Sequence, residues 1–227
     1  MPNVSGHAKK TDRHYDMILK KTIFTIILFY SLTVIAQGQI RVTPLDTIKL
    51  PVGIKYKGKI HDAVQWTDKL GLNVVITTET GTYPIKSADS DGLWGAELFA
   101  YHYIITNDSA KEMWKVYDFI KPCALDIYAK FKKNAFQITD LNNDNIAEIW
   151  LMYNVECRSD IGPNEMKIIM YQGQQKYAMR GQDKVKITEN QYEGGEYTFD
   201  KAFVNAPEEF REYAKKLWDK NMMQTWD

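Results

Sequence analysis

The sequence is poor in the residues and motifs that mark the common enzyme classes. Its four histidines and two cysteines have no metal-ligand spacing, and no HExxH motif accompanies them. Serine-nucleophile, Walker and dinucleotide-binding motifs are absent as well. The sequence therefore offers no recognisable catalytic constellation of these classes.

Net charge and long hydrophobic runs are lacking too. The chain has 29 Lys and Arg against 29 Asp and Glu and no basic stripe, which argues against a nucleic-acid partner. Its uncharged run at 22–35 has 14 residues, fewer than the roughly 20 that a membrane-spanning helix needs. Lys20 and Lys21 precede this run, and Ala36 and Gly38 follow it, as is typical of a secretory signal peptide. An N-terminal membrane anchor is the alternative.

This pattern predicts an exported protein. Residues 1–16 form an extension ahead of Met17, and we expect residues 1–36 to be removed by cleavage near Ala36. No cysteine lies at the end of the apolar run, which excludes lipid attachment there. We expect one domain, 37–227, without a membrane span, in the periplasm, at the outer surface or secreted.

Both cysteines, Cys123 and Cys157, fall in the predicted exported part. An even number of cysteines in an exported chain favours a disulfide bond. Two buried free thiols are the alternative.

The exported part is predicted to be mainly β. Short runs of β-branched, aromatic and alternating residues are bounded by Gly, Asn, Asp or Pro, which favours an antiparallel meander of hairpins, propeller-like or sandwich-like. The segment 118–132 mixes strand and helix signals and stays open. The predicted strands are 72–79, 96–105, 113–119, 147–155, 166–171 and 176–180.

A helix is predicted over about 207–221, with Pro207 at its first position and acidic residues in its first turn. Its apolar residues recur at helical spacing and should pack on a sheet. The similarity of Ala96-Glu-Leu-Phe99 to Ala147-Glu-Ile-Trp150 hints at a repeated hairpin, although chance among short strands explains it equally well.

One Asn-rich loop carries oxygen-bearing side chains at alternate positions. Calcium takes about six to eight oxygen ligands, and a tight loop supplies several when alternate residues turn inward. Asn145 falls at the sharp turn, where Asn tolerates the left-handed conformation. An EF-hand is excluded because its twelfth position would be Leu151; a metal-free turn is the alternative. The predicted ligands of a structural calcium ion are Asp140, Asn142, Asp144, Ile146 (through its carbonyl) and Glu148.

The pattern D-x-N-x-D-N-x-x-E resembles the calcium loops of FG-GAP and VCBS-like repeats, with Asn145 in place of the usual Gly. A wider set of segments resembles exported bacterial envelope proteins labelled surface polysaccharide biosynthesis proteins. That resemblance implies an envelope setting and a glycan-related role, and it supplies no catalytic residues. The segments are Pro122-Cys123, 139–148, 157–160, 166–170 and 176–181.

We therefore predict a non-catalytic protein that binds or scaffolds at the cell envelope, with surface glycan or envelope proteins as partners. Exposed aromatic rings stack on sugar faces, and Trp94 in a Gly-flanked turn is the best candidate. Arg158, Asp160 and Glu165 are further candidate ligand-binding residues. The alternative is an envelope enzyme that uses Asp160 and Glu165 as a glycosidase carboxylate pair, and a merely solvated loop would explain these charges too.

Overall fold

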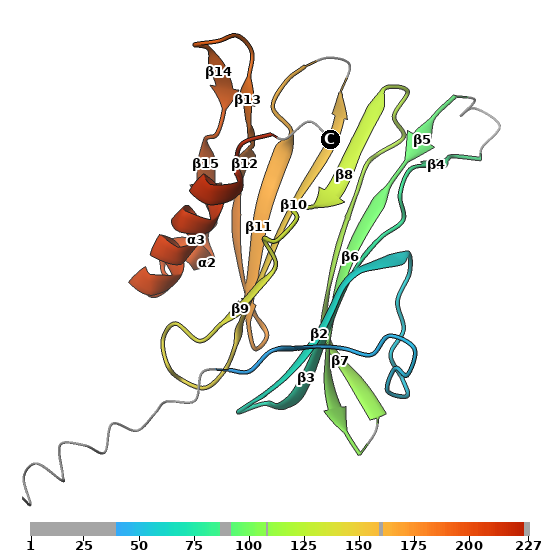
Figure 1. Ribbon diagram of the computed structural model, residues 1–227, viewed down its shortest axis with the longest axis vertical. Coiled ribbons are helices and arrows are strands. Elements are labelled where there is room, and N and C mark those ends of the chain that lie inside the picture. Colours follow the sequence, from blue (N-terminus) through green and yellow to red (C-terminus); the bar gives the residue numbers. More distant parts are fainter. Residues whose placement is uncertain (1–39, 87–91, 108, 159–160, 225–227) are drawn as a thin grey trace, which may run out of the picture. The chain divides into compact units, whose positions relative to one another are not determined.

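Runs rich in β-branched and aromatic residues form two large antiparallel sheets in this chain. The computed structural model describes residues 40–86, 92–107, 109–158 and 161–224, so the predicted signal peptide lies outside the described residues. The first sheet has the strand order β1-β2-β3-β6-β7 (Figure 1). Its strands are β1 (Thr43–Pro44), β2 (Lys59–Asp68), β3 (Gly71–Glu79), β6 (Glu97–Thr106) and β7 (Ser109–Phe119).

The second sheet has the order β15-β12-β11-β10-β8, and the short β9 pairs with one end of β10. Two small hairpins, β4–β5 and β13–β14, complete the β structure. The strands are β4 (Tyr83–Pro84), β5 (Trp94–Gly95), β8 (Asp126–Phe131), β9 (Gln137–Thr139), β10 (Glu148–Arg158), β11 (Glu165–Gln172), β12 (Gln175–Gln182), β13 (Lys184–Lys186), β14 (Tyr192–Gly194) and β15 (Tyr197–Phe199).

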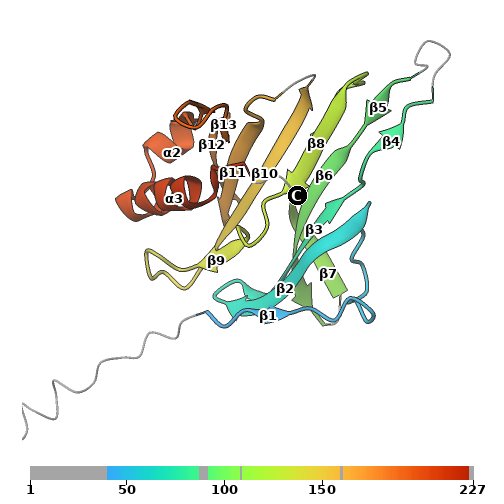
Figure 2. The same cartoon turned by 45° about the horizontal axis from the view of Figure 1, so that its top comes forward.

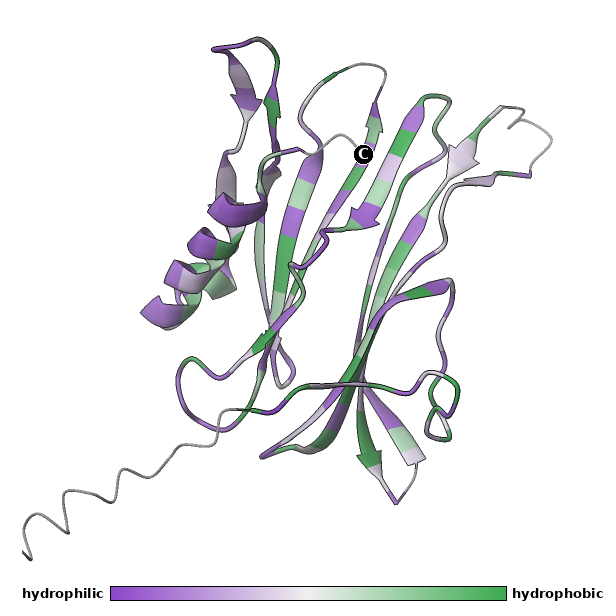
Figure 3. Ribbon diagram, viewed as in Figure 1, coloured by the Kyte–Doolittle hydropathy of each residue, from purple (hydrophilic) through white to green (hydrophobic). Residues whose placement is uncertain are grey.

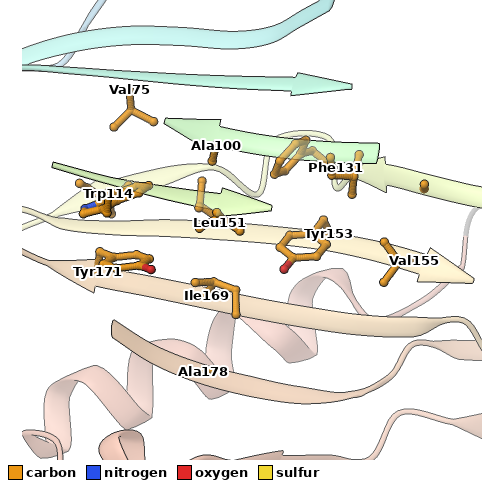
Figure 4. Packing of buried hydrophobic residues seen from close by; sticks show 14 of the residues in the cluster. Val75, Ala100, Trp114, Phe131, Leu151, Tyr153, Val155, Ile169, Tyr171 and Ala178 are labelled. Carbon is orange, nitrogen blue, oxygen red and sulfur yellow. The ribbon is translucent and has the colours of Figure 1, made fainter. Parts of the chain in front are cut away.

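The inner faces of the two sheets share one apolar core. Trp114 of β7 stacks on Tyr171 of β11, with ring centroids 4.2 Å apart, and Figure 4 shows this pair among the buried residues around Leu151. Large buried side chains from both sheets make this the main hydrophobic contribution to folding. The predicted mainly β, antiparallel fold is thus confirmed, in its sandwich-like form.

Helices cover the outer face of the second sheet. Helices α2 (Lys201–Val204) and α3 (Glu208–Asn221) bury Phe203, Phe210 and Trp218 against Trp150 and its neighbours (Figure 2). The helices are mainly hydrophilic with hydrophobic residues interspersed (Figure 3), as expected when one side contacts a sheet and the other faces water. This packing confirms the predicted role of the C-terminal helix.

Several local details differ from the sequence-based expectations. Pro207 is the N-cap of α3 and not its first helical residue, because its ψ of 145° is extended. Helix α2, which was not predicted, begins where the Asp200 carboxylate accepts a hydrogen bond from the Phe203 N–H. Strand β2 was not predicted either, and the open segment 118–132 contains strand β8.

The predicted disulfide is confirmed. Cys123 and Cys157 are bonded, with their Cα atoms 6.0 Å apart, so the alternative of two free thiols is wrong. Cys123 lies between β7 and β8 and Cys157 lies in β10, so the bond ties the segment that follows the first sheet to the second sheet. A disulfide is compatible with an oxidising environment outside the cytoplasm.

Within the described ranges, we find no helix with both the length and the apolar character of a membrane span.

Candidate metal centre and ligand-binding surface

The predicted calcium loop connects β9 to β10, two antiparallel neighbours. Side-chain carboxylates fold it: Asp140 accepts the N–H groups of Asp144 and Asn145 at 3.1 and 3.2 Å. Asp144 accepts the N–H of Ile146 at 2.8 Å. Asn145 has a φ of 62°, the left-handed conformation predicted for it, and Asn143 has a φ of 57°.

Four oxygen atoms of this loop converge on one nitrogen, the amide Nε2 of Gln172 in β11. Its distances are 2.9 Å to Asp144 Oδ2, 3.3 Å to Asn142 Oδ1, 3.4 Å to Glu148 Oε1 and 3.5 Å to the Ile146 carbonyl. These are four of the five predicted ligand residues. The fifth, Asp140, uses both carboxylate oxygens to hold the loop backbone and does not contact this nitrogen by a hydrogen bond.

Glu148 is a fully buried carboxylate within this group. Burial raises its pKa, the negative charges of Asp140 and Asp144 raise it further, and hydrogen bonds from Thr139 and Leu141 act in the opposite direction. Among the residues that the structure describes, no Lys or Arg forms an ion pair with any of these three carboxylates. The loop is therefore a concentration of negative charge without a protein cation.

The donor set fits calcium. Calcium prefers a mixture of carboxylate, amide and carbonyl oxygens, which the loop provides. In the described ranges no three acidic, His or Cys side chains lie close enough to hold a metal by themselves. A cation here would therefore depend on the neutral oxygens of Asn142 and Ile146 as well as on Asp144 and Glu148.

The loop is also attached to the first sheet, through the turn between β2 and β3. Lys69 N–H donates to the Asn145 carbonyl at 2.8 Å, and Ala147 N–H donates to Asp68 Oδ2 at 3.1 Å. Asp68 accepts three more hydrogen bonds, from Trp66, Leu70 and Asn73, so its charge is already well solvated by the protein. Sequence reasoning missed the link to the loop because Ala147 lies 79 residues away from Asp68 in the chain.

The predicted carboxylate pair near the disulfide is not tested by the structure, because only one of its two residues lies within the described ranges. Glu165 forms an ion pair with Lys167 at 3.3 Å, and Asp160 lies outside the described residues. Arg158 donates to the Gly162 carbonyl at 3.2 Å and lies 5.8 Å from the Tyr128 ring. Catalysis through Asp160 and Glu165 therefore stays a prediction.

Trp94 is 44% exposed, as expected, and lies beside the disulfide. Its backbone exchanges two hydrogen bonds with Cys123, at 2.8 and 3.0 Å. The ring therefore stands on a covalently anchored part of the fold.

A second exposed aromatic group lies on β7, the edge strand of the first sheet. Tyr117 and Phe119 are 48% and 46% exposed, and their nearly parallel rings are 5.3 Å apart. Tyr117 also stacks on the buried Phe99, at 5.0 Å. The sequence signal was the run of large apolar residues at alternate positions up to Phe119, but their exposure depends on β7 being an edge.

Charged groups stand beside these rings. Tyr117 donates its hydroxyl hydrogen to Glu97 Oε1 at 2.9 Å, and the Lys57 ammonium forms an ion pair with the same carboxylate. Burial acts to raise the pKa of Glu97, but the hydrogen bonds from Lys57 and Tyr117 outweigh it and the pKa is lowered. Burial and the Glu97 carboxylate raise the pKa of Tyr117 to about 12, so its hydroxyl stays a neutral donor.

Comparison with protein-family models, with curated proteins and with solved structures found no match for this chain. The envelope-protein and FG-GAP resemblances therefore stay predictions from the sequence.

Proposed function

We propose that this chain is a non-catalytic protein of the cell envelope whose β-sandwich is stabilised by one calcium ion in the loop between β9 and β10. The observation that supports this most directly is the convergence of four loop oxygens around the Gln172 amide nitrogen. Calcium would supply the positive charge that this group lacks among the described residues.

The loop's own residues fit a structural role for the ion. Asp144 and Glu148 provide charge, and Asn142 and Ile146 provide neutral oxygens. Because Asn145 and Ala147 are bonded to the β2–β3 turn, an ion held here would fix a connection that touches both sheets. An exported protein meets calcium at levels that match the ~10⁻⁴–10⁻³ M dissociation constants of extracellular modules.

Thermal melting in calcium, magnesium and chelator tests this proposal. At about 1 mM calcium, these affinities give a gain of roughly 0.4–1.4 kcal/mol, or about 1–5 °C in Tm. Magnesium should do less because it demands rigid octahedral coordination. Asp144→Ala should lose the calcium response, whereas Asp219→Ala, on the exposed side of α3, should keep it. Equal melting of the wild type in calcium and chelator would contradict the proposal.

The second proposed activity is binding of surface polysaccharide at the exposed face formed by Tyr117 and Phe119. Two exposed, nearly parallel rings offer stacking surfaces for sugar C–H groups, and Lys57 and Glu97 beside them offer a donor and an acceptor for hydroxyls. Tyr117 is anchored by its stack on Phe99 and its bond to Glu97, which limits the entropy lost on binding.

A glycan array with the mature domain tests this activity. Tyr117→Ala and Phe119→Ala should each weaken binding of any glycan found by about tenfold or more, as expected for an aromatic anchor. Val204→Ala, an exposed apolar residue on α2, is the matched control and should leave binding unchanged. Glycan binding that survives both ring deletions would place the activity elsewhere.

A further inference from the structure

Gln172 lies outside the loop that it completes. It is the last residue of β11 and stands directly opposite Glu148 in the register of β10 and β11. The pairing of β11 with β10 therefore fixes the backbone of Gln172 beside the end of the loop.

The hydrogen bonds of Gln172 do not balance. Its Nε2 carries two hydrogens, yet four oxygens lie within 3.5 Å of it. Only Asp144 Oδ2 is at the 2.9 Å of an ordinary hydrogen bond, and the other three distances are 3.3 to 3.5 Å. A single cation can be shared by four oxygens, whereas an NH₂ group cannot satisfy all four.

We infer that Gln172 occupies the cation position when the loop is metal-free and becomes a ligand when the cation binds. This inference rests on the calcium site proposed above. A carboxamide carries its nitrogen and its oxygen on the same planar group, so a half-turn exchanges them. In the free state the NH₂ group faces the loop oxygens and offsets part of their repulsion. In the bound state Oε1 faces the ion, which adds a neutral ligand from β11.

If Gln172 has both roles, variants at this position should rank differently in calcium affinity and in stability without calcium. Gln172→Met has similar length but neither hydrogens nor oxygen, and Gln172→Glu adds a charged oxygen and removes the hydrogens. Calcium affinity should follow Glu, then Gln, then Met, because affinity rises with ligand charge and number. Stability in chelator should follow Gln, then Met, then Glu. Of these three side chains only the Gln amide donates hydrogen bonds to the loop carboxylates, whereas Glu would add a fourth carboxylate that repels the other three.

Calorimetric titration with calcium chloride and thermal melting in chelator measure the two orders on the mature domain. We expect Gln172→Met to bind calcium roughly tenfold more weakly than the wild type, at the lower end of the effects of groups that support a metal site. Gln175→Met, at an exposed glutamine that begins β12, is the matched control and should behave as the wild type does.

The possible outcomes distinguish a failure of the Gln172 inference from a failure of the proposed calcium site. Wild type that binds calcium, with Gln172→Met binding as well or better, would show that Gln172 only competes with the ion, and the inference would be wrong. Wild type that binds no calcium would overturn both the calcium site and the inference. Weaker binding by Gln172→Met together with stronger binding by Gln172→Glu supports the inference.

Discussion

Glu97 and Glu148 hold the same place in two hairpins of the sandwich, the first formed by β6 and β7 and the second by β10 and β11, but their surroundings differ. Each is the first residue of a long strand, β6 or β10, and each is buried, at 8% and 0% exposure. Glu97 pairs with the Lys57 ammonium, whereas Glu148 lies near two aspartates and accepts hydrogen bonds from neutral groups. The first carboxylate is paired within the protein, whereas among the described residues no Lys or Arg forms an ion pair with the second.

The pKa values follow this difference. Burial acts to raise both, but at Glu97 the bonds from Lys57 and Tyr117 lower the pKa below its ordinary value. At Glu148 burial and the neighbouring carboxylates raise it. A buried group keeps its charge at low free-energy cost only when an opposite charge is near.

The largest expected effect comes from removing the disulfide, which ties the segment after the first hairpin to the second hairpin. Replacing Cys123 and Cys157 by Ser together should lower the free energy of unfolding by about 4 kcal/mol, because the bond closes a loop across a separation of 34 residues. Denaturant unfolding of this variant and of the wild type measures it. A difference under about 1 kcal/mol would mean that noncovalent packing alone fixes the hairpins.

A lysine at position 172 should make the second hairpin resemble the first. Gln172→Lys places an ammonium among Asp144 and Glu148, and hydrogen bonds to charged groups contribute about 1.5–3 kcal/mol. After desolvation we expect the melting temperature in chelator to rise by a few degrees and the response to calcium to disappear. A variant that still gains stability from calcium would contradict the analogy with Lys57.

Removing Lys57, which precedes β2 and pairs with Glu97, should have a smaller effect, which depends on pH. The lowered pKa of Glu97 means that its stabilisation is present above the ordinary pKa of 4.5 and is lost as the pH falls through the folded value. Lys57→Met should therefore destabilise the protein at pH 7, and its difference from the wild type should shrink below about pH 4. A difference independent of pH would point to lost packing of the lysine stem instead of lost charge.

Local patterns in the sequence predicted much of this fold. Runs of β-branched, aromatic and alternating residues predicted six of the seven described strands with eight or more residues. The position of Asn145 predicted its left-handed turn, and the cysteine count in a predicted exported chain predicted the disulfide. These features depend on nearby residues or on simple counting. The repeated Ala-Glu motif at Ala96 and Ala147 gains a structural counterpart, since both alanines are buried in the core at corresponding ends of β6 and β10.

Local sequence patterns did not predict the order of the strands in the sheets. The site residues that were missed depend on that order. Gln172 follows the predicted strand 166–171 and was not among the candidate residues, and it reaches the loop because β11 pairs with β10. Asp68 meets Ala147 across the two sheets, and Tyr117 is exposed because β7 is an edge. Pairing over such sequence distances is set by global packing, which the alternation within one strand does not encode.

The most direct test of the central claim is a crystal structure of the mature domain grown in about 10 mM calcium, roughly 10 to 100 times the dissociation constants expected for extracellular modules. The account predicts a calcium ion at about 2.3–2.6 Å from Asn142 Oδ1, Asp144 Oδ2, Glu148 Oε1 and the Ile146 carbonyl, with Gln172 turned to present its oxygen. A loop that holds no ion under these conditions, with the Gln172 NH₂ group still among the four oxygens, would contradict it.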